Sequence, residues 1–256
     1  MERYKYDLHI HSCLSPCGDN DMTPNNMVNM AALLGCDIMA VTDHNDSRNV
    51  PAAVEVGKQA GVLVVPGMEL CTSEEAHVVC LFDSVEGCLE FQKYVYSQTP
   101  DIKNRADIFG DQLILDENDE VIGTEERLLL SSSFISVNEV LPLARKYGGT
   151  AFPAHVNADS YSVIASLGAI PDEAGFTACE ITRDCDIEQL KILNPEIEGK
   201  LVFTDSDSHY LHLMTEDMNW IELPEKSLSA LIAFIDGRGE GRLETFRRRP
   251  RISSEM

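Results

Sequence analysis

His9 and His11 are the first residues along the chain that suit a reactive site. One residue separates them in the segment 6–12, and alternate residues of a β-strand face the same side. Two imidazoles on one side, with Asp7 before them and a polar turn after them, form half of a metal site. The sequence therefore predicts a strand over residues 6–11, with further ligands supplied from elsewhere in the chain.

Other histidines and carboxylates fall at the ends of predicted strands. In a barrel of parallel strands, the carboxyl ends converge on the face where active sites are built. His77 comes early in a predicted strand, but a short turn precedes that strand, and a hairpin-like entry would reverse it and bring His77 to the same face. His212 does not fit the pattern and is assigned to the surface or to a place behind the ligands. The residues at strand ends are His44, Glu69, His155, Asp207 and His209.

The donor types indicate which ions would bind. Histidine and carboxylate ligands without paired cysteines suit Zn²⁺, Mn²⁺ or Fe²⁺. The eight cysteines include no CxxC pair and are expected to be reduced thiols. One ion cannot use so many ligands, so we expect two or three divalent ions, with Glu69 as the natural bridge. Clustered divalent ions generate hydroxide at neutral pH and hold both oxygens of a phosphoryl transfer.

The elements that would position these ligands alternate along the chain. Several predicted strands are continuous apolar runs, which is typical of a mostly parallel sheet covered by helices. Seven or eight strand–helix units in this length favour a closed α/β barrel over an open sheet. Strands are predicted at 37–42, 62–69, 76–82, 150–155, 176–181, 201–205 and 219–223, and helices at 24–34, 51–60, 84–96, 136–147, 162–167, 187–193 and 228–235.

Residues 98–126 interrupt this alternation. The stretch is acidic and has few large apolar residues, and it contains a candidate hairpin with strands near 113–115 and 121–122. We expect an insertion within a single domain spanning residues 1–256. It either covers an active site or is an inert excursion.

Composition and charge limit the class of function. With 44% hydrophobic and 25% charged residues, the chain is typical of a globular protein. Its net charge of −23 repels nucleic-acid backbones, which weighs against binding long nucleic acid but not a small phosphate ester beside bound cations. The basic residues 247–251 are expected to form a solvated tail. No apolar run is long enough for a bilayer and no signal-peptide core is present, so a cytoplasmic location is expected; the oligomeric state is open.

Six ordered motifs resemble those of the PHP (polymerase and histidinol phosphatase) superfamily. They are DLHIHS at 7–12, TDH at 42–44, PGME at 66–69, the lone His77, AH at 154–155 and SDSH at 206–209, and the resemblance covers residues 6–210 apart from the insertion. It implies a distorted (β/α)7 TIM-like barrel with a trinuclear metal site. By similarity, His9, His11, Glu69 and Asp207 would hold the first ion, Glu69, His77 and His155 the second, and His44 and His209 the third.

One motif departs from the family pattern. The family usually carries an Asp or His shortly after the first two histidines to complete the third site, and here Pro16 falls where the Asp would be. Asp19 is the expected substitute, because a hard oxygen ligand suits phosphate chemistry. Cys17 is the rival, and a third ion that binds weakly or is absent is the other alternative.

These observations predict a metal-dependent phosphoesterase in which a hydroxide bridging the metals attacks a small phosphate ester. Nucleotides, short oligonucleotides and sugar or amino-alcohol phosphates are all candidates. Arg183, after the predicted strand 176–181, either clamps the phosphate or forms a surface salt bridge. Asp7, Asp43 and Asp205 are expected to orient ligand histidines. The alternatives are a metal-dependent amidohydrolase, disfavoured because no lysine ends a strand in the motif region, and a non-catalytic metal-binding regulatory protein.

Overall fold

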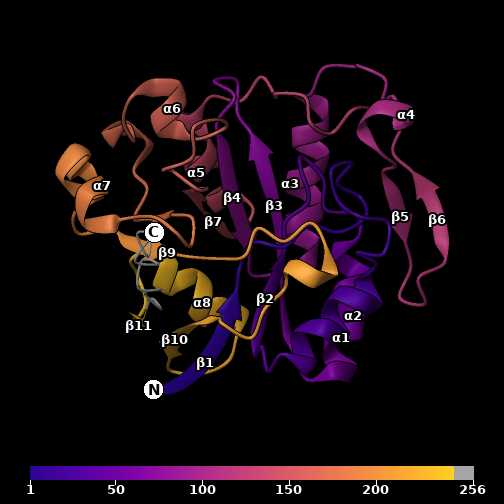
Figure 1. Ribbon diagram of the computed structural model, residues 1–256, viewed down its shortest axis with the longest axis horizontal. Helices are drawn as coiled ribbons and strands as arrows, with labels where there is room; N and C mark the ends of the chain where they lie inside the picture. The colour runs from indigo at the N-terminus through magenta and orange to yellow at the C-terminus, as the bar shows by residue number, and fades with distance from the viewer. Residues whose placement is uncertain (245–256) are drawn as a thin grey trace, which may run out of the picture.

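The computed structural model describes residues 1–244, and its largest element is a curled seven-stranded sheet (Figure 1). The basic residues 247–251, predicted to form a tail, lie outside the described residues. The sheet has the order β11–β10–β1–β2–β3–β4–β7. Its strands are β1 (Glu2–Asp7), β2 (Ile38–Val41), β3 (Leu63–Cys71), β4 (His77–Phe82), β7 (Gly149–Pro153), β10 (Asn219–Leu223) and β11 (Arg242–Glu244).

Helices follow most of the strands, as the alternation predicts. The α-helices are α1 (Pro24–Leu33), α2 (Val50–Ala60), α3 (Val85–Ser97), α4 (Ala106–Phe109), α5 (Val137–Lys146), α6 (Val163–Leu167), α7 (Ile187–Leu193) and α8 (Leu228–Ile235). Short 3₁₀ turns cover Asp172–Ala174, Pro195–Ile197 and Leu211–Leu213. Thr23 caps α1, with Pro24 in its first turn, as the sequence predicts. None of these helices has the length and apolar character needed to cross a membrane.

The direction of β4 explains how His77 reaches the ligand-bearing end of the sheet. β1, β2 and β3 are parallel, whereas β4 pairs antiparallel with both β3 and β7. His77 is the first residue of β4, and it pairs with Cys71 at the carboxyl end of β3. The predicted reversal of this strand is therefore confirmed.

The curl of the sheet brings its two ends toward each other. β8 (Ala178–Glu180) and β9 (Leu201–Phe203) form a separate parallel pair. The amide of Val156, just after β7, donates to the carbonyl of Glu180 (2.8 Å), and the amide of His11 donates to the carbonyl of Ser208 (3.0 Å). The fold is thus a mixed α/β structure with a curled half-barrel sheet and a hydrogen-bond ladder that is not continuous, and the (β/α)7 strand count stays a prediction.

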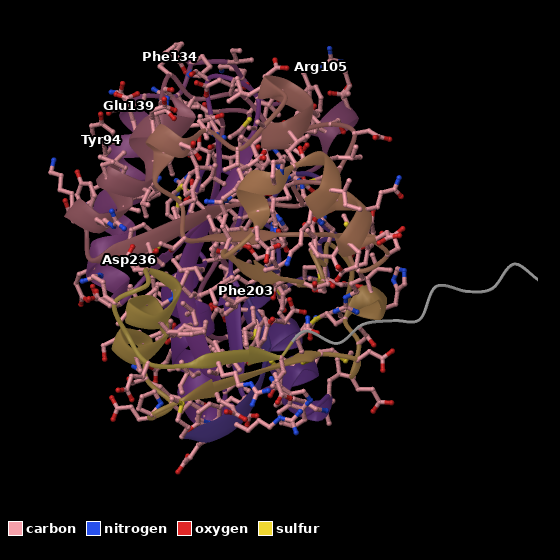
Figure 2. All side chains as sticks on the ribbon, turned by 90° about the vertical axis from the view of Figure 1, so that its left-hand side faces the viewer. Tyr94, Arg105, Phe134, Glu139, Phe203 and Asp236 are labelled. Atoms are coloured by element: carbon pink, nitrogen blue, oxygen red, sulfur yellow. The ribbon has the colours of Figure 1, made fainter. Side chains whose placement is uncertain are left out.

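Two apolar cores lie on opposite faces of the curled sheet. The inner core contains Tyr6, Leu8, Val65 and Phe203, with α8 packed against it. Phe203, which is labelled in Figure 2, is fully buried. The outer core fills the space between the sheet and helices α1, α2, α3 and α5. This arrangement buries both faces of the strands, which explains why they are apolar runs and not alternating patterns.

The first strand begins and ends four residues earlier than predicted. β1 ends at Asp7, not at residue 11, because side chains replace the next ladder partners. The amide of Leu8 donates to Asp205 Oδ1 (2.7 Å), and the amide of Ile10 donates to Thr42 Oγ1 (3.1 Å). His9 and His11 therefore lie beyond the regular strand, yet their Nε2 atoms are 3.1 Å apart.

The insertion forms a separate layer at one side of the sheet (Figure 1). It contains α4 and the predicted hairpin, with β5 (Leu113–Leu115) antiparallel to β6 (Val121–Thr124). Polar side chains just after His44 fasten it to the barrel. The guanidinium of Arg48 pairs with Asp46 and with Glu125 of the insertion, and Asn45 Nδ2 donates to the carbonyls of Leu129 and Ser131, which follow the insertion. The insertion is thus attached next to a candidate ligand.

Asn49 joins three segments at this attachment. Its buried amide donates to Ser12 Oγ and to the carbonyl of Leu113, both at 3.0 Å, and it accepts from the amide of Leu115 at 2.9 Å. We expect Asn49→Ala to lower the free energy of unfolding by about 2–4 kcal/mol, because several buried polar groups lose their partner. Urea denaturation measures this change. Asn29→Ala, on the exposed face of α1, is the control and should shift stability by less than about 0.5 kcal/mol; equal effects would contradict the assignment.

Candidate metal centre

Glu69, within β3, lies at the centre of a cluster of histidines. Its carboxylate is almost fully buried, with 1% of the side chain exposed. Oε1 lies 3.0 Å from His77 Nδ1, 3.2 Å from His155 Nε2 and 3.3 Å from His9 Nε2. One oxygen of this carboxylate therefore meets rings from the first segment, from β4 and from the end of β7.

The other side of the cluster is built on the second oxygen of Glu69 and on Asp207. Glu69 Oε2 lies 2.8 Å from His44 Nδ1 and 3.4 Å from His11 Nε2. Asp207 Oδ1 lies 3.3 Å from His11 Nε2 and 3.6 Å from His209 Nδ1. The two oxygens of Glu69 thus face different sets of rings, which is the geometry required of a bridging ligand.

Three groups of donor atoms are close enough to hold an ion, with all atoms of a group within 4.8 Å of one another. All their members were predicted from the sequence, but the partition differs from the one implied by the resemblance, because His44 groups with Glu69 and His77. His155 and Asp207 contact these groups without being members of them. The groups are His9–His11–Glu69, His44–Glu69–His77 and His11–His44–His209.

Asp19, the expected ligand of a third ion, belongs to none of these groups. Its amide donates to the carbonyl of His209 (2.9 Å), so its backbone is near the centre, but its Oδ1 accepts from the amide of Asp21 (2.8 Å). The rival Cys17 is also outside the groups. The Cys17 side chain is exposed.

Unusual backbone conformations turn several ligands toward the centre. Asp207 (φ 49°) and His155 (φ 30°) both have positive φ, as does Asn45 (φ 52°), which follows His44. Non-glycine residues seldom adopt this region, and such strain is concentrated at functional sites. The amide of Asn45 donates to the carbonyl of Glu69 (2.9 Å), which joins the ends of β2 and β3.

Glu180 is a residue of the site that the sequence analysis missed. It is buried at the end of β8, and its carboxylate lies 2.9 Å from His9 Nδ1 and accepts from the amide of His155 at 3.1 Å. A carboxylate that binds the second nitrogen of a metal-binding imidazole fixes its tautomer and orientation. The only signal in the sequence is a charged residue inside the predicted apolar strand 176–181.

The three aspartates expected to orient histidines divide into two kinds. Asp43 accepts from Ser15 Oγ (2.7 Å), and Ser15 Oγ lies 2.9 Å from His11 Nδ1, so Asp43 acts on a ligand through a serine. Asp7 and Asp205 instead accept from backbone amides, of Ser206 (3.0 Å) and Leu8 (2.7 Å). They hold the two ligand-bearing segments together and do not orient a ring.

Arg183, the predicted phosphate clamp, lies beside the segment that leads to Asp207. Its Nε donates to the carbonyl of Asp205 (3.3 Å), and its charge acts to lower the pKa of Asp7, which burial raises. The side chain is half-buried. Because Arg183 contacts the backbone at Asp205 and not the metal donors, its role as a phosphate clamp stays a prediction.

The electrostatics favour ionised carboxylates. Although burial opposes the charged form, His77, His9 and His44 hold the pKa of Glu69 well below its ordinary value. Burial likewise opposes protonation of His9, but Glu180, Asp207 and Glu69 raise its pKa well above the ordinary value. Burial lowers the pKa of His11 well below it, and the neighbouring rings of His209 and His44 add to this effect. Glu69 is thus a carboxylate and His11 a neutral imidazole, the forms in which these two groups ligate metals, whereas the raised pKa of His9 favours a protonated ring whose proton a bound ion would have to displace.

Three buried atoms indicate that the cluster fits a cation. Glu69 Oε2, His44 Nδ1 and Asp207 Oδ1 lack a well-aligned hydrogen-bond partner within residues 1–244, although the first two atoms lie 2.8 Å apart. Buried polar atoms without partners are costly, and here all three belong to side chains that meet at one place. Divalent ions between the carboxylates and rings would satisfy these atoms, and the nitrogen and oxygen donors suit Zn²⁺, Mn²⁺ or Fe²⁺.

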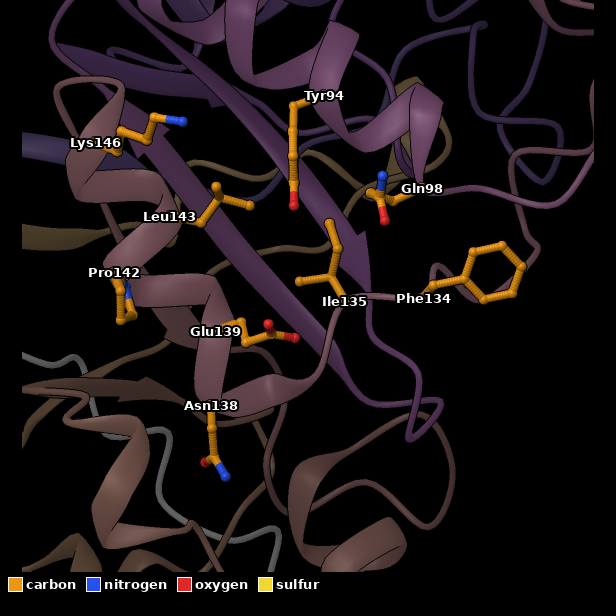
Figure 3. Close-up of a pocket in the computed structure, with 9 residues that line it drawn as sticks. All are labelled: Tyr94, Gln98, Phe134, Ile135, Asn138, Glu139, Pro142, Leu143 and Lys146. Carbon is orange, nitrogen blue, oxygen red and sulfur yellow. The ribbon is translucent and has the colours of Figure 1, made fainter.

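A cavity of about 410 Å³ lies elsewhere, in a groove between α3 and α5. Figure 3 shows Tyr94 of α3 and Gln98, just after α3, facing Glu139 and Leu143 of α5. None of its nine lining residues is a predicted ligand. The candidate metal centre is therefore not this groove.

Comparisons with known proteins agree with the motifs. The model of the PHP domain matches residues 7–137. A 5′-3′ exoribonuclease of Haemophilus influenzae is 31% identical over 113 residues, which are 43% of this chain and 39% of that protein. A phosphoribosyl 1,2-cyclic phosphate 1,2-diphosphodiesterase of Eggerthella lenta is 38% identical over 64 residues, 25% of this chain and 23% of that protein. These matches span less than half of either relative.

Solved structures show a similar fold. The lesion-specific endonuclease Q of Pyrococcus furiosus matches 94% of this chain and 58% of its own, with a TM-score of 0.71 and 17% identity. Endonuclease Q has also been solved with a 27-mer duplex containing an abasic lesion. An amidohydrolase of Chromobacterium violaceum with bound sulfate matches 80% of this chain and 88% of its own, with a TM-score of 0.55 and 18% identity.

Proposed function

This chain belongs to the PHP domain family, and we propose that it is a metal-dependent phosphoesterase that hydrolyses a small phosphate ester. The observation that carries the proposal is the buried carboxylate of Glu69 within 3.4 Å of five imidazole rings, those of His9, His11, His44, His77 and His155. A carboxylate that shares its two oxygens among so many donors suits the bridging ligand of a multinuclear centre.

Two or three divalent ions would be held by the donors that converge here. Glu69 Oε1 would serve an ion with His77 and His155, and Asp207 would serve one with His9 and His11. His44 and His209 would complete the set. When bound, such ions activate water at neutral pH and stabilise negative charge on phosphate oxygens.

The remaining residues prepare this centre for a phosphate. Glu180 holds the ring of His9, and Ser15 holds the ring of His11. The Asp207 side chain is 41% exposed, whereas those of His9, His11 and Glu69 are at most 1% exposed, so substrate would approach from the Asp207 side. Arg183 would bind a phosphate oxygen there by moving from the carbonyl of Asp205.

Two observations bear on the substrate class. The names of the relatives, an exoribonuclease and a phosphoribosyl 1,2-cyclic phosphate 1,2-diphosphodiesterase, support esters of ribose phosphates, with a base in the first case and without one in the second. The net charge of −23 favours a small or short substrate over a long nucleic acid. The duplex bound by endonuclease Q shows that the fold itself does not exclude long nucleic acid, so duplex DNA belongs among the substrates tested.

The alternatives receive less support. No lysine ends a strand in the motif region of the sequence, which disfavours an amidohydrolase with a lysine-derived bridge. A non-catalytic metal-binding protein would not need the complete set of converging donors. Neither alternative is favoured by a particular contact.

Hydrolysis of phosphate esters is the direct test, followed as inorganic phosphate from monoesters and as mononucleotides from oligonucleotides. The full chain with added Mn²⁺ is expected to release one of these products from nucleoside monophosphates or short oligonucleotides, to lose this activity in EDTA and to regain it with Mn²⁺. A metal count on the same sample should give two or three ions per chain. Bound ions without release from any ester, duplex DNA included, would refute the proposal, and release that resists EDTA would refute its metal dependence.

A further inference from the structure

Tyr161 places an aromatic ring beside the candidate metal centre. It lies between β7 and α6, and the residue is 52% exposed. Its ring stacks on that of His77, with centroids 4.9 Å apart and an angle of 23° between the planes. Because His77 Nδ1 is 3.0 Å from Glu69 Oε1, only one imidazole separates Tyr161 from the central carboxylate.

The backbone of Tyr161 is strained into this position. Its φ of 53° lies in the left-handed region, which is unfavourable for a bulky side chain. The amide of His77 donates to its carbonyl (2.9 Å), and Ser162, the next residue, caps α6. Asp207 and His155 of the centre share the positive φ. Strain at a functional site persists where the surrounding contacts fix it, and here they fix an exposed ring.

The Tyr161 ring is exposed, and so are parts of three candidate ligands. The side chains of Asp207, His209 and His77 are 41%, 20% and 12% exposed, in contrast to the buried rings of His9 and His11. A phosphate ester would reach the donors over these exposed ligands. The part of the substrate that is not phosphate must then lie over the exposed ligands, where Tyr161 offers the free face of its ring.

We propose that Tyr161 is a specificity residue whose ring stacks against the base of a nucleotide substrate. Bases stack on aromatic side chains with little regard to sequence, since every base has a π-face. The inference rests on the proposed phosphoesterase function and narrows it: esters that carry a base are hydrolysed in preference to those that lack one. A ring that only shielded His77 would not discriminate between the two.

The experiment compares the fastest nucleotide of the phosphate-release panel with ribose 5-phosphate, which lacks a base. Tyr161→Asn removes the ring and replaces it with a residue that tolerates positive φ, so folding is preserved. Tyr161→Phe keeps the ring. Tyr94→Asn is the matched control, because Tyr94 is an exposed tyrosine that lines the separate groove between α3 and α5 (Figure 3).

We expect Tyr161→Asn to lower kcat/KM for the nucleotide about tenfold or more, mainly by raising KM. The same substitution should lower kcat/KM for ribose 5-phosphate by less than about twofold. Tyr161→Phe and Tyr94→Asn should leave unchanged the ratio of kcat/KM for the nucleotide to kcat/KM for ribose 5-phosphate. An equal effect of Tyr161→Asn on both substrates, or a fastest ester without a base, overturns the role of Tyr161 and leaves the phosphoesterase standing. No release from any ester by the unaltered protein overturns both.

Discussion

Replacing Glu69 with glutamine is expected to lower phosphate release by about a thousandfold or more, since the loss of one preorganised polar group at a reacting centre already costs about 10²–10³ in rate. Glutamine has nearly the same shape but carries no charge, and its amide nitrogen cannot act as a metal ligand. Both oxygens of Glu69 face donor rings. The substitution therefore disturbs two ion positions at once, whereas the loss of one histidine disturbs fewer contacts.

The measurement is phosphate release with saturating Mn²⁺, beside a metal count and a circular dichroism melt in EDTA. Glu69→Gln should bind fewer ions than the unaltered protein and keep its secondary structure. Glu55→Gln, at an exposed ion pair with Lys58 on α2, is the matched control and should behave as the unaltered protein does. Wild-type turnover by a verified Glu69→Gln sample would exclude Glu69 as the bridge.

The ligand set could be predicted because it depends on strand ends. His44, Glu69 and His155 come at the carboxyl ends of apolar runs, and parallel strands place such ends together whatever the details of packing. His77 required one further inference, the reversal of β4, for which the short turn before it was sufficient. These side chains converge because of the order and direction of the strands, and the hydrophobic pattern of the sequence is sufficient to locate those strands.

For His9 and His11, the predicted convergence is found in the structure, but the predicted reason for it is not. The sequence predicts that His9 and His11 share one side because they alternate along a regular strand. In the structure the ladder stops at Asp7, and contacts with Asp205 and Thr42 guide the backbone from there. These partners come from strands distant in the sequence. The convergence was therefore predicted, but its cause was not.

The ligand expected to complete the third ion site lies in a loop, whose conformation the sequence pattern does not predict. Asp19 was favoured for its oxygen chemistry, yet its carboxylate accepts a hydrogen bond within its own turn from the amide of Asp21. Asp side chains commonly bind a backbone amide two residues on, and this local bond competes with a distant ligand role. The attachment of the insertion through Arg48 and Asn49 was equally hidden, because it joins segments with no shared periodicity.

Glu180 was missed for a physical reason that also gives a prediction. Its carboxylate does not face the ions but binds the far nitrogen of His9, so no ligand motif includes it. Glu180→Gln should weaken metal binding about 10–100-fold, the usual cost of losing a partner of a ligating histidine. Glutamine cannot supply the charge that favours the Nδ1–H tautomer, in which His9 Nε2 is free to ligate.

A titration of activity with Mn²⁺ distinguishes this positioning role from direct ligation. Glu180→Gln should need more Mn²⁺ for half-maximal activity but recover most of it at high concentration, whereas Glu69→Gln should not recover. Glu196→Gln is the matched control, because Glu196 also accepts a backbone amide, that of Ile170 (3.1 Å), in a part of the chain that supplies no candidate ligand. A Glu180→Gln protein with an unchanged Mn²⁺ requirement would show that the ring of His9 is held by its ions and its packing. Recovery by Glu69→Gln at high Mn²⁺ would instead show that Glu69 positions the ligands and does not bridge the ions.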